Sequence, residues 1–219
     1  GKTMSVVCPA VKAFGEGLGE KLFYLTARTV TAQAARDAFA ILQKQGLRLK
    51  RVFLTAKEKI CPLEEPQCDP EHCPYARGHY DRVNEAVYTF LQNQDYGGRE
   101  ELLDWAEQYQ VCPFAFSLDV SSFADAVVGD YNYAFSPTAR LKRFFGEGMK
   151  GDYIFLIDEA HNLVDRSREM FSAALCKEDF LAMKKLAKPV SRKLERALER
   201  CNRYLLERKR ECEDYEVLR

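Results

Sequence analysis

The chain has 219 residues, of which 47% are hydrophobic and 30% charged, and its 33 Lys and Arg residues balance 33 Asp and Glu residues. This composition is typical of a folded soluble protein, and the zero net charge provides no global attraction to nucleic acid, so any basic surface must be local. No apolar run approaches the ~18 residues of a membrane span and no secretion signal is present, so we expect a cytoplasmic protein without membrane contact.

Hydrophobic periodicity in the first quarter predicts alternating helices and strands. The expected elements are a helix over residues 3–14, a strand over 21–26, an alanine-rich helix over 31–44 and a strand over 51–55. This alternation is typical of an α/β fold with a parallel sheet.

The alternation stops over residues 60–75, which contain three cysteines and four prolines. Proline is excluded from helix interiors and central strands, so this segment is predicted to be an irregular loop that needs something to fold around. Helices are predicted over residues 79–93 and 99–110.

The remaining chain returns to regular patterns before becoming wholly helical. The expected elements are a helix over 117–123, a strand over 124–128, a helix over 137–145, a strand over 153–157 and helices over 177–188 and 190–218.

Two motifs at opposite ends of the α/β region carry candidate chemistry. Gly1-Lys2-Thr3 matches the end of a phosphate-binding loop, in which the lysine reaches the β- and γ-phosphates and the hydroxyl holds Mg²⁺. The strand at 153–157 runs directly into Asp158-Glu159-Ala160-His161, as a buried parallel strand does when it delivers carboxylates to the C-terminal edge of a sheet. Together they supply a phosphate clamp, a metal-binding acid and a water-orienting acid, which ATP hydrolysis needs. They resemble motifs I and II of superfamily 2 helicases.

Four of the eight cysteines lie in or beside irregular structure, and three of these four precede proline. They are Cys61, Cys68, Cys73 and Cys112. Disulfides would need an oxidising compartment, for which the sequence has no signal. A structural zinc site usually takes two close cysteine pairs, whereas an iron–sulfur cluster accepts irregular spacing; both readings stay open, and the irregular spacing favours the cluster. The other four cysteines fall on helical patterns, where they are expected to be packing residues.

Basic and aromatic residues flank the cysteines and form a candidate surface for single-stranded nucleic acid. They are Lys57, Lys59, Tyr75, Arg77, Tyr80 and Arg82. An ordinary solvated surface is an equally good explanation. Tyr131 and Tyr133 are expected to pack rather than to stack on bases.

Several motifs occur in the order found in the XPD/DinG group of iron–sulfur superfamily 2 DNA helicases, which the chain resembles over nearly its whole length. These are Gly1-Lys2-Thr3, Phe23-Tyr-Leu-Thr26-Ala-Arg28-Thr29, the four-cysteine insertion, Cys112-Pro-Phe, Asp130-Tyr-Asn-Tyr133 and Asp158-Glu-Ala-His161. The resemblance implies a RecA-like motor domain interrupted by a 4Fe-4S domain and then by a helical arch. The corresponding divisions are motor residues 1–59, cluster residues 60–113, motor residues 114–165 and arch residues 166–219.

The same resemblance implies ATP with Mg²⁺ and a 4Fe-4S cluster as cofactors, and translocation in the 5′ to 3′ direction on single-stranded or forked DNA. Gly1, Lys2, Thr3 and Asp158 would bind the nucleotide and its metal. Glu159 would orient and deprotonate the attacking water, and His161 would couple the nucleotide site to other motifs. The cluster would be held by the four cysteines, and Thr26, Arg28 and Thr29 would face the DNA backbone.

The chain departs from the family pattern at both ends. The glycine-rich start of motif I is absent, and so is the second motor domain with its arginine fingers. We therefore expect a fragment that neither hydrolyses ATP processively nor unwinds DNA by itself. The rival hypothesis is a non-enzymatic, metal-stabilised module that binds nucleic acid without ATP.

Overall fold

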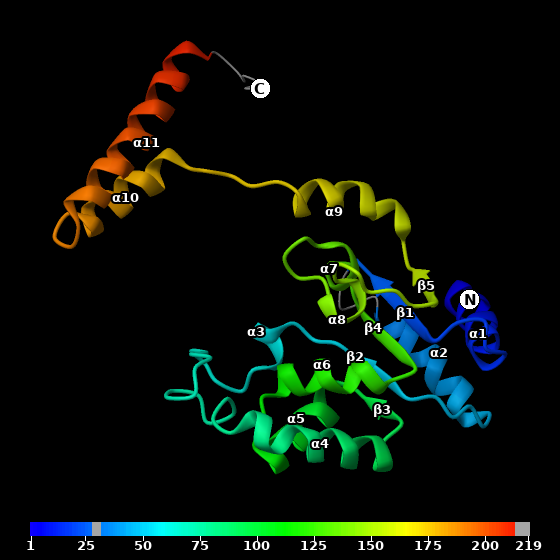
Figure 1. Cartoon of the computed structure of the whole chain (residues 1–219). Coiled ribbons are helices and arrows are strands. Elements are labelled where there is room, and N and C mark those ends of the chain that lie inside the picture. Colours follow the sequence, from blue (N-terminus) through cyan, green and yellow to red (C-terminus); the bar gives the residue numbers. More distant parts are fainter. Residues whose placement is uncertain (28–31, 213–219) are drawn as a thin grey trace. The chain divides into compact units, whose positions relative to one another are not determined.

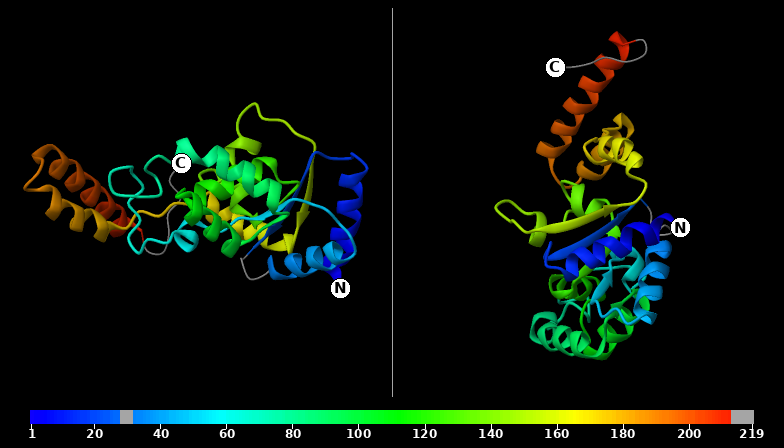
Figure 2. Two further views of the ribbon diagram at one scale, coloured as in Figure 1. Left: turned by 90° about the horizontal axis from the view of Figure 1, so that it is seen from below. Right: turned by 90° about the vertical axis from the view of Figure 1, so that its right-hand side faces the viewer.

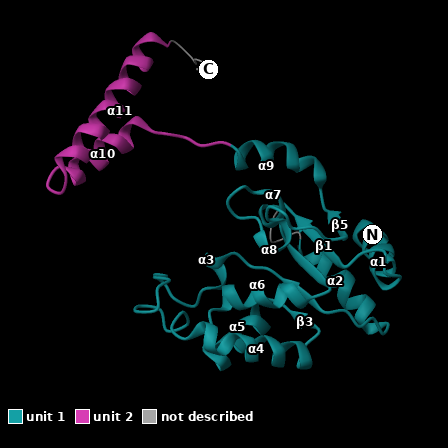
Figure 3. Ribbon diagram, viewed as in Figure 1, with its two compact units in different colours: residues 1–171 teal, residues 172–219 magenta. Residues whose placement is uncertain are grey.

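The computed structural model describes residues 1–27 and 32–212 and divides the chain into two compact units, residues 1–171 and 172–219 (Figure 3). Two residues with a predicted role, Arg28 and Thr29, lie outside the described residues.

The first unit is built on a five-stranded sheet in the order β3-β2-β4-β1-β5, in which every neighbouring pair is parallel (Figure 1). The strands are β1 (Lys21–Thr26), β2 (Arg51–Phe53), β3 (Tyr96–Gly97), β4 (Ala126–Asp130) and β5 (Tyr153–Ile157). The prediction of an α/β fold with a parallel sheet is confirmed.

Helices connect these strands. They are α1 (Lys2–Gly15), α2 (Ala32–Lys44), α3 (Lys57–Ile60), α4 (His79–Asn93), α5 (Arg99–Tyr109), α6 (Pro113–Phe123), α7 (Asn132–Phe135), α8 (Lys142–Phe145), the 3₁₀ turn η2 (Ala160–Asn162) and α9 (Leu163–Met170). The predicted irregular segment is confirmed, since no helix or strand lies between Ile60 and His79.

Both faces of the sheet are buried, and alternate residues of β1 show this directly. Leu22 and Tyr24 pack in a core formed with α1 and α2, whereas Phe23 and Leu25 pack in a second core formed with α4, α5 and α6. Side chains alternate across a strand, so a strand covered on both sides is apolar throughout. The further views in Figure 2 show helices on both sides of the strands.

The expectation that residues 153–157 form a buried strand is wrong in one respect. Among the described strands, β5 pairs with β1 only and is the last strand of the sheet. Four of its five residues are half-buried, and Phe155 is 42% exposed. Apolar composition cannot distinguish a central strand from an edge strand whose faces are partly covered.

Other predicted elements differ from the structure in their bounds. The strand expected at 51–55 ends at Phe53, and the helix expected at 117–123 begins earlier, at Pro113. The strand expected at 124–128 begins two residues later, because Ala124 still donates its N–H to the Val120 carbonyl and so ends α6. The helix expected over 137–145 is reduced to the four residues of α8, since the chain after Pro137 forms turns instead.

The second unit is a pair of packed helices, α10 (Lys177–Ala187) and α11 (Arg192–Glu211). The Ser191 hydroxyl caps α11 by accepting the Leu194 N–H at 3.3 Å. None of the described helices is both long enough and apolar enough to cross a membrane.

Candidate functional site

Parallel pairing brings the ends of β1, β4 and β5 to one edge of the sheet. Thr26 is in register with Asp130, and the Asp158 N–H donates to the Leu25 carbonyl at 2.9 Å. Three of the polar residues singled out in the sequence therefore emerge at the edge where α/β proteins bind ligands.

The Gly1-Lys2-Thr3 motif meets the acidic motif at this edge. Gly1 precedes the first turn of α1, and the Lys2 Nζ lies 2.8 Å from the Glu159 Oε1. This hydrogen bond raises the pKa of Lys2 and lowers the pKa of Glu159. The structure thus joins a cation and a carboxylate that are far apart in the sequence, beside a helix N-terminus that favours anions.

A cavity of about 200 Å³ lies beside this pair. Its walls include Lys2, Thr3, Tyr24 and Asp158, together with apolar residues of β5 and α1. Burial, and the nearby Asp158 carboxylate, raise the pKa of the Tyr24 hydroxyl. Tyr24 was not foreseen as part of the site, although its place two residues before Thr26 on β1 put it near the sheet edge.

The acidic turn has a backbone conformation that needs support. Glu159 has φ 49° and ψ 49°, in the left-handed region that few residues other than glycine adopt. Its carbonyl accepts hydrogen bonds from Asn162 Nδ2 at 3.1 Å and from the Tyr131 hydroxyl at 3.0 Å. The His161 Nδ1 lies 3.4 Å from the Glu159 Oε2, so the turn holds the carboxylate between the imidazole and Lys2.

All eight cysteines are free thiols, and the four that were singled out are linked electrostatically. Cys112 interacts with Cys73 and Cys61, and burial raises the pKa of the Cys112 thiol. The neighbouring Cys68, and with smaller effect Cys112 and Cys61, raise the pKa of Lys57. Thiols from the loop that follows α3 and from the start of α6 therefore lie near one lysine.

The spacing of these thiols differs from that of a preformed single-ion site. Tetrahedral zinc with Zn–S bonds of 2.3 Å holds its sulfurs about 3.8 Å apart. Among the described residues, no three cysteine sulfurs lie within 4.8 Å of one another. Four thiols are the donor set that an iron–sulfur cluster takes.

Two neighbouring histidines have other partners. The His72 Nδ1 lies 2.7 Å from an Asp69 carboxylate oxygen. His79 is buried, and its Nδ1 accepts the Cys112 N–H at 3.2 Å, so it fixes the backbone of the fourth cysteine to the start of α4. Burial lowers the pKa of His79.

Two of the basic residues of the candidate nucleic-acid surface donate hydrogen bonds to backbone carbonyls of this chain. Arg77 donates to the carbonyls of Pro70 and Glu71, at 3.0 and 2.9 Å. Arg82 donates to the carbonyls of Tyr109, Arg77 and Gln110. Arg77 thus stabilises the cysteine loop internally, and Arg82 ties that loop to the end of α5; both roles are structural.

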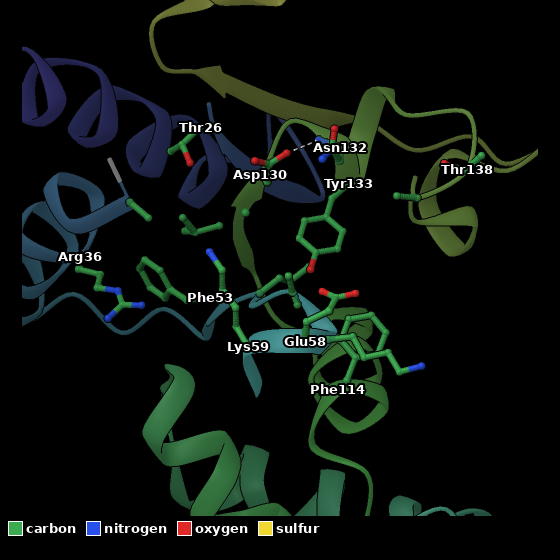
Figure 4. A pocket seen from close by; sticks show the side chains of 17 residues that line it. Thr26, Arg36, Phe53, Glu58, Lys59, Phe114, Asp130, Asn132, Tyr133 and Thr138 are labelled. Carbon is green, nitrogen blue, oxygen red and sulfur yellow. Dashed lines mark hydrogen bonds between the residues drawn. The ribbon is translucent and has the colours of Figure 1, made fainter. Parts of the chain in front are cut away.

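A second and larger cavity, of about 510 Å³, lies at the ends of β1, β2 and β4 (Figure 4). Thr26, Asp130 and Tyr133 line it, as do Arg36 from α2 and Lys59 from α3. Burial raises the pKa of Tyr133 to about 12, and the Asn132 N–H donates to the Asp130 carboxylate at 2.8 Å. Thr26 therefore borders a cavity with both polar and apolar walls. Tyr131 does not line this cavity; it is fully buried and packs in the core, as expected.

The DEAD_2 family model matches residues 29–180, which is more than half of the chain, and the chain belongs to this family. The ATP-dependent DNA helicase CHL1 of Kluyveromyces lactis is 32% identical over 116 residues, which cover 53% of this chain and 14% of that protein. The resemblance to XPD/DinG-type helicases stated from the motifs is thereby confirmed.

Two solved structures share the fold. An XPD helicase superposes with a TM-score of 0.60 at 20% identity, covering 94% of this chain and 35% of that structure. A truncated XPD superposes with a TM-score of 0.55 at 23% identity, covering 86% of this chain and 54% of that structure. The chain thus spans well under two thirds of the relatives that it matches.

Proposed function

We propose that the chain supplies the ATP-binding part of a DNA helicase of the XPD/DinG type that translocates 5′ to 3′ on single-stranded DNA. The contact between the Lys2 Nζ and the Glu159 Oε1, at 2.8 Å, carries this proposal. A phosphate-binding lysine and a carboxylate that positions water must lie on either side of the same phosphate group, and this pair is already juxtaposed.

The roles of the site residues follow from their chemistry. Lys2 would release Glu159 and neutralise phosphate charge, beside the first backbone N–H groups of α1, which follow Gly1. Thr3 and Asp158 would hold Mg²⁺, directly or through water. Glu159 would orient the attacking water and accept its proton. His161, beside Glu159, would couple the nucleotide site to other motifs.

Cys61, Cys68, Cys73 and Cys112 would hold a 4Fe-4S cluster. The set of four free thiols and its irregular spacing along the sequence support this assignment over a single zinc ion. The cluster would supply a rigid cross-link between the loop that follows α3, the start of α4 and the start of α6. In the absence of that cross-link, loop closure would have to be stabilised by the few hydrogen bonds of the segment alone.

DNA would contact this unit beside Thr26, Arg28 and Thr29, at the end of β1. The support is the position of Thr26 at the sheet edge, next to the 510 Å³ cavity and to Lys59. Unwinding by this mechanism would require the second motor domain that the family pattern leads us to expect.

Nucleotide binding by the chain tests the central claim. With a fluorescent ATP analogue and Mg²⁺, Lys2→Ala should weaken binding by at least about tenfold, since a charge-assisted bond to phosphate is lost. Lys12→Ala is the matched control, because Lys12 lies on the same helix and makes only an exposed pair with Glu16 at 3.7 Å. Equal affinities of the two variants would refute the assignment of Lys2.

A further inference from the structure

Helix α11 of the second unit is strongly basic, although the chain as a whole has no net charge. It carries eight lysines and arginines against four glutamates. Ala197, Leu198 and Leu205 are half-buried, whereas most of the basic residues are exposed. The helix is therefore amphipathic, with an apolar side and a charged side.

Four arginines recur along one side of α11 at helical spacing. They are Arg192, Arg196, Arg200 and Arg203, called the arginine stripe below, and all four are exposed. Steps of three and four residues place side chains on the same face, about 4.5–6 Å apart along the axis. The stripe is thus a row of cations rather than a scattering of solvated charges.

Among the described residues, no acidic side chain forms an ion pair with these arginines. The pairs found in this unit join Lys177 to Glu178, Lys184 to Glu199, and Arg208 to Glu211. Like charges three and four residues apart repel one another and destabilise a helix. An anionic ligand would relieve that repulsion.

The ion pair that crosses from α10 strengthens the stripe. The Lys184 ammonium contacts the Glu199 carboxylate and so neutralises an acid that lies beside Arg196 and Arg200. The same residues, with Glu195 and Arg203, border a hollow of about 450 Å³ on the surface. The hollow therefore presents three arginine guanidinium groups, while one of its two acidic side chains is paired.

We propose that the arginine stripe binds the phosphate backbone of single-stranded DNA. Guanidinium groups match phosphate oxygens in charge and in fork geometry, and a row of cations on a rigid helix suits a chain of evenly repeated anions. The inference rests on the proposed function for the class of ligand, and on α10 and α11 for the surface.

The test measures binding of a fluorescent oligothymidylate to the whole chain by anisotropy, without nucleotide, at about 50 to 200 mM salt. Each phosphate contact on single-stranded DNA contributes about −0.7 to the slope of log K against log salt. The variant Arg196→Gln, Arg200→Gln, Arg203→Gln should therefore bind about tenfold more weakly at low salt, with a slope reduced by about 2.

Two further variants separate charge at the stripe from net charge and from folding. Lys185→Gln, Lys188→Gln, Lys209→Gln removes the same charge from exposed positions outside the hollow and should bind like the unchanged chain. Arg196→Lys, Arg200→Lys, Arg203→Lys keeps the charge and should retain most of the affinity. Circular dichroism checks that all variants keep their helix content.

An unchanged affinity and slope in the glutamine stripe variant would overturn the proposal, and so would an equal loss in the control variant. Neither result would touch the proposed ATP site, because Lys2 lies in the other unit and the assay contains no nucleotide. Conversely, unimpaired binding of the ATP analogue by Lys2→Ala would refute the proposed nucleotide site. It would not affect the proposal that the arginine stripe binds single-stranded DNA.

Discussion

The hydroxyl of Tyr131 donates to the backbone carbonyl of Asp158, and so the end of β4 supports the turn that follows β5. Tyr131 is fully buried, and the same hydroxyl lies 3.0 Å from the Glu159 carbonyl. A single phenol thereby stabilises a turn in which Glu159 adopts a left-handed conformation.

Tyr131→Phe should loosen this turn. It removes the donor from two carbonyls, so we expect a loss of about 1–2 kcal/mol in the free energy of unfolding and weaker binding of Mg-ATP. Urea unfolding and titration with a fluorescent ATP analogue measure the two effects. The control is Tyr133→Phe, because the Tyr133 hydroxyl makes no hydrogen bond to another described residue. If the two substitutions had equal effects, the role given to Tyr131 would be excluded.

Glu159→Gln should separate nucleotide binding from hydrolysis. The amide keeps the size of the side chain but cannot accept a proton, so turnover should fall by at least about 100-fold while ATP affinity is maintained. The measurement is DNA-stimulated phosphate release by a protein that also contains the second motor domain. Glu169→Gln is the control, since Glu169 pairs with Arg166 on the surface of α9. Substantial hydrolysis by Glu159→Gln would rule out this carboxylate as the base.

Cys112→Ser should prevent assembly of the iron–sulfur cluster. Serine retains the shape of the side chain but loses the thiolate, so anaerobically purified variant should lack the absorbance near ~400 nm that thiolate-bound clusters give. Cys201→Ser, on α11, should keep the full absorbance, because Cys201 lies in the other unit. Metal analysis accompanies the spectra, and a colourless, zinc-loaded parent protein would refute the iron assignment.

Protonation of His79 should make stability depend on pH. Burial lowers its pKa, and its neutral Nδ1 accepts the Cys112 N–H. The unfolded state therefore binds this proton more readily, so the contribution of His79 is present above about pH 6.5 and is lost as pH falls towards the lower folded pKa. Without iron, we expect about 1 kcal/mol less stability at pH 5.5 than at pH 7.5.

Urea unfolding of His79→Gln and His161→Gln tests this expectation. Glutamine does not titrate, so the pH dependence between these values should disappear in the first variant. It should persist in the second, because the His161 side chain is exposed and its partner Glu159 is itself 39% exposed. A parent protein with flat stability across this range would contradict the role of His79.

Local patterns in the sequence were sufficient for the class of fold and for several residues of the candidate site. Strand and helix periodicity predicted most elements of the parallel sheet, because burial on both faces leaves an apolar run that ends where the strand ends. Asp158 and Glu159 were identifiable because polar residues that directly follow such a run emerge at the edge of a sheet. Proline beside cysteine likewise marked the irregular segment.

Only the tertiary structure decided which distant groups meet. The position of β5 at the end of the sheet, the contact of Lys2 with Glu159 and the support from Tyr131 depend on strand order and register, which arise from packing across the whole chain. The tertiary structure also shows that the Arg82 guanidinium binds the carbonyls of Tyr109 and Gln110 at the end of α5. Likewise, Arg196, Arg200 and Arg203 form a row because α11 is continuous. The sequence does not distinguish a charged side chain that binds backbone carbonyls from one that remains exposed. Only the neighbouring residues in space show which of these environments the side chain has.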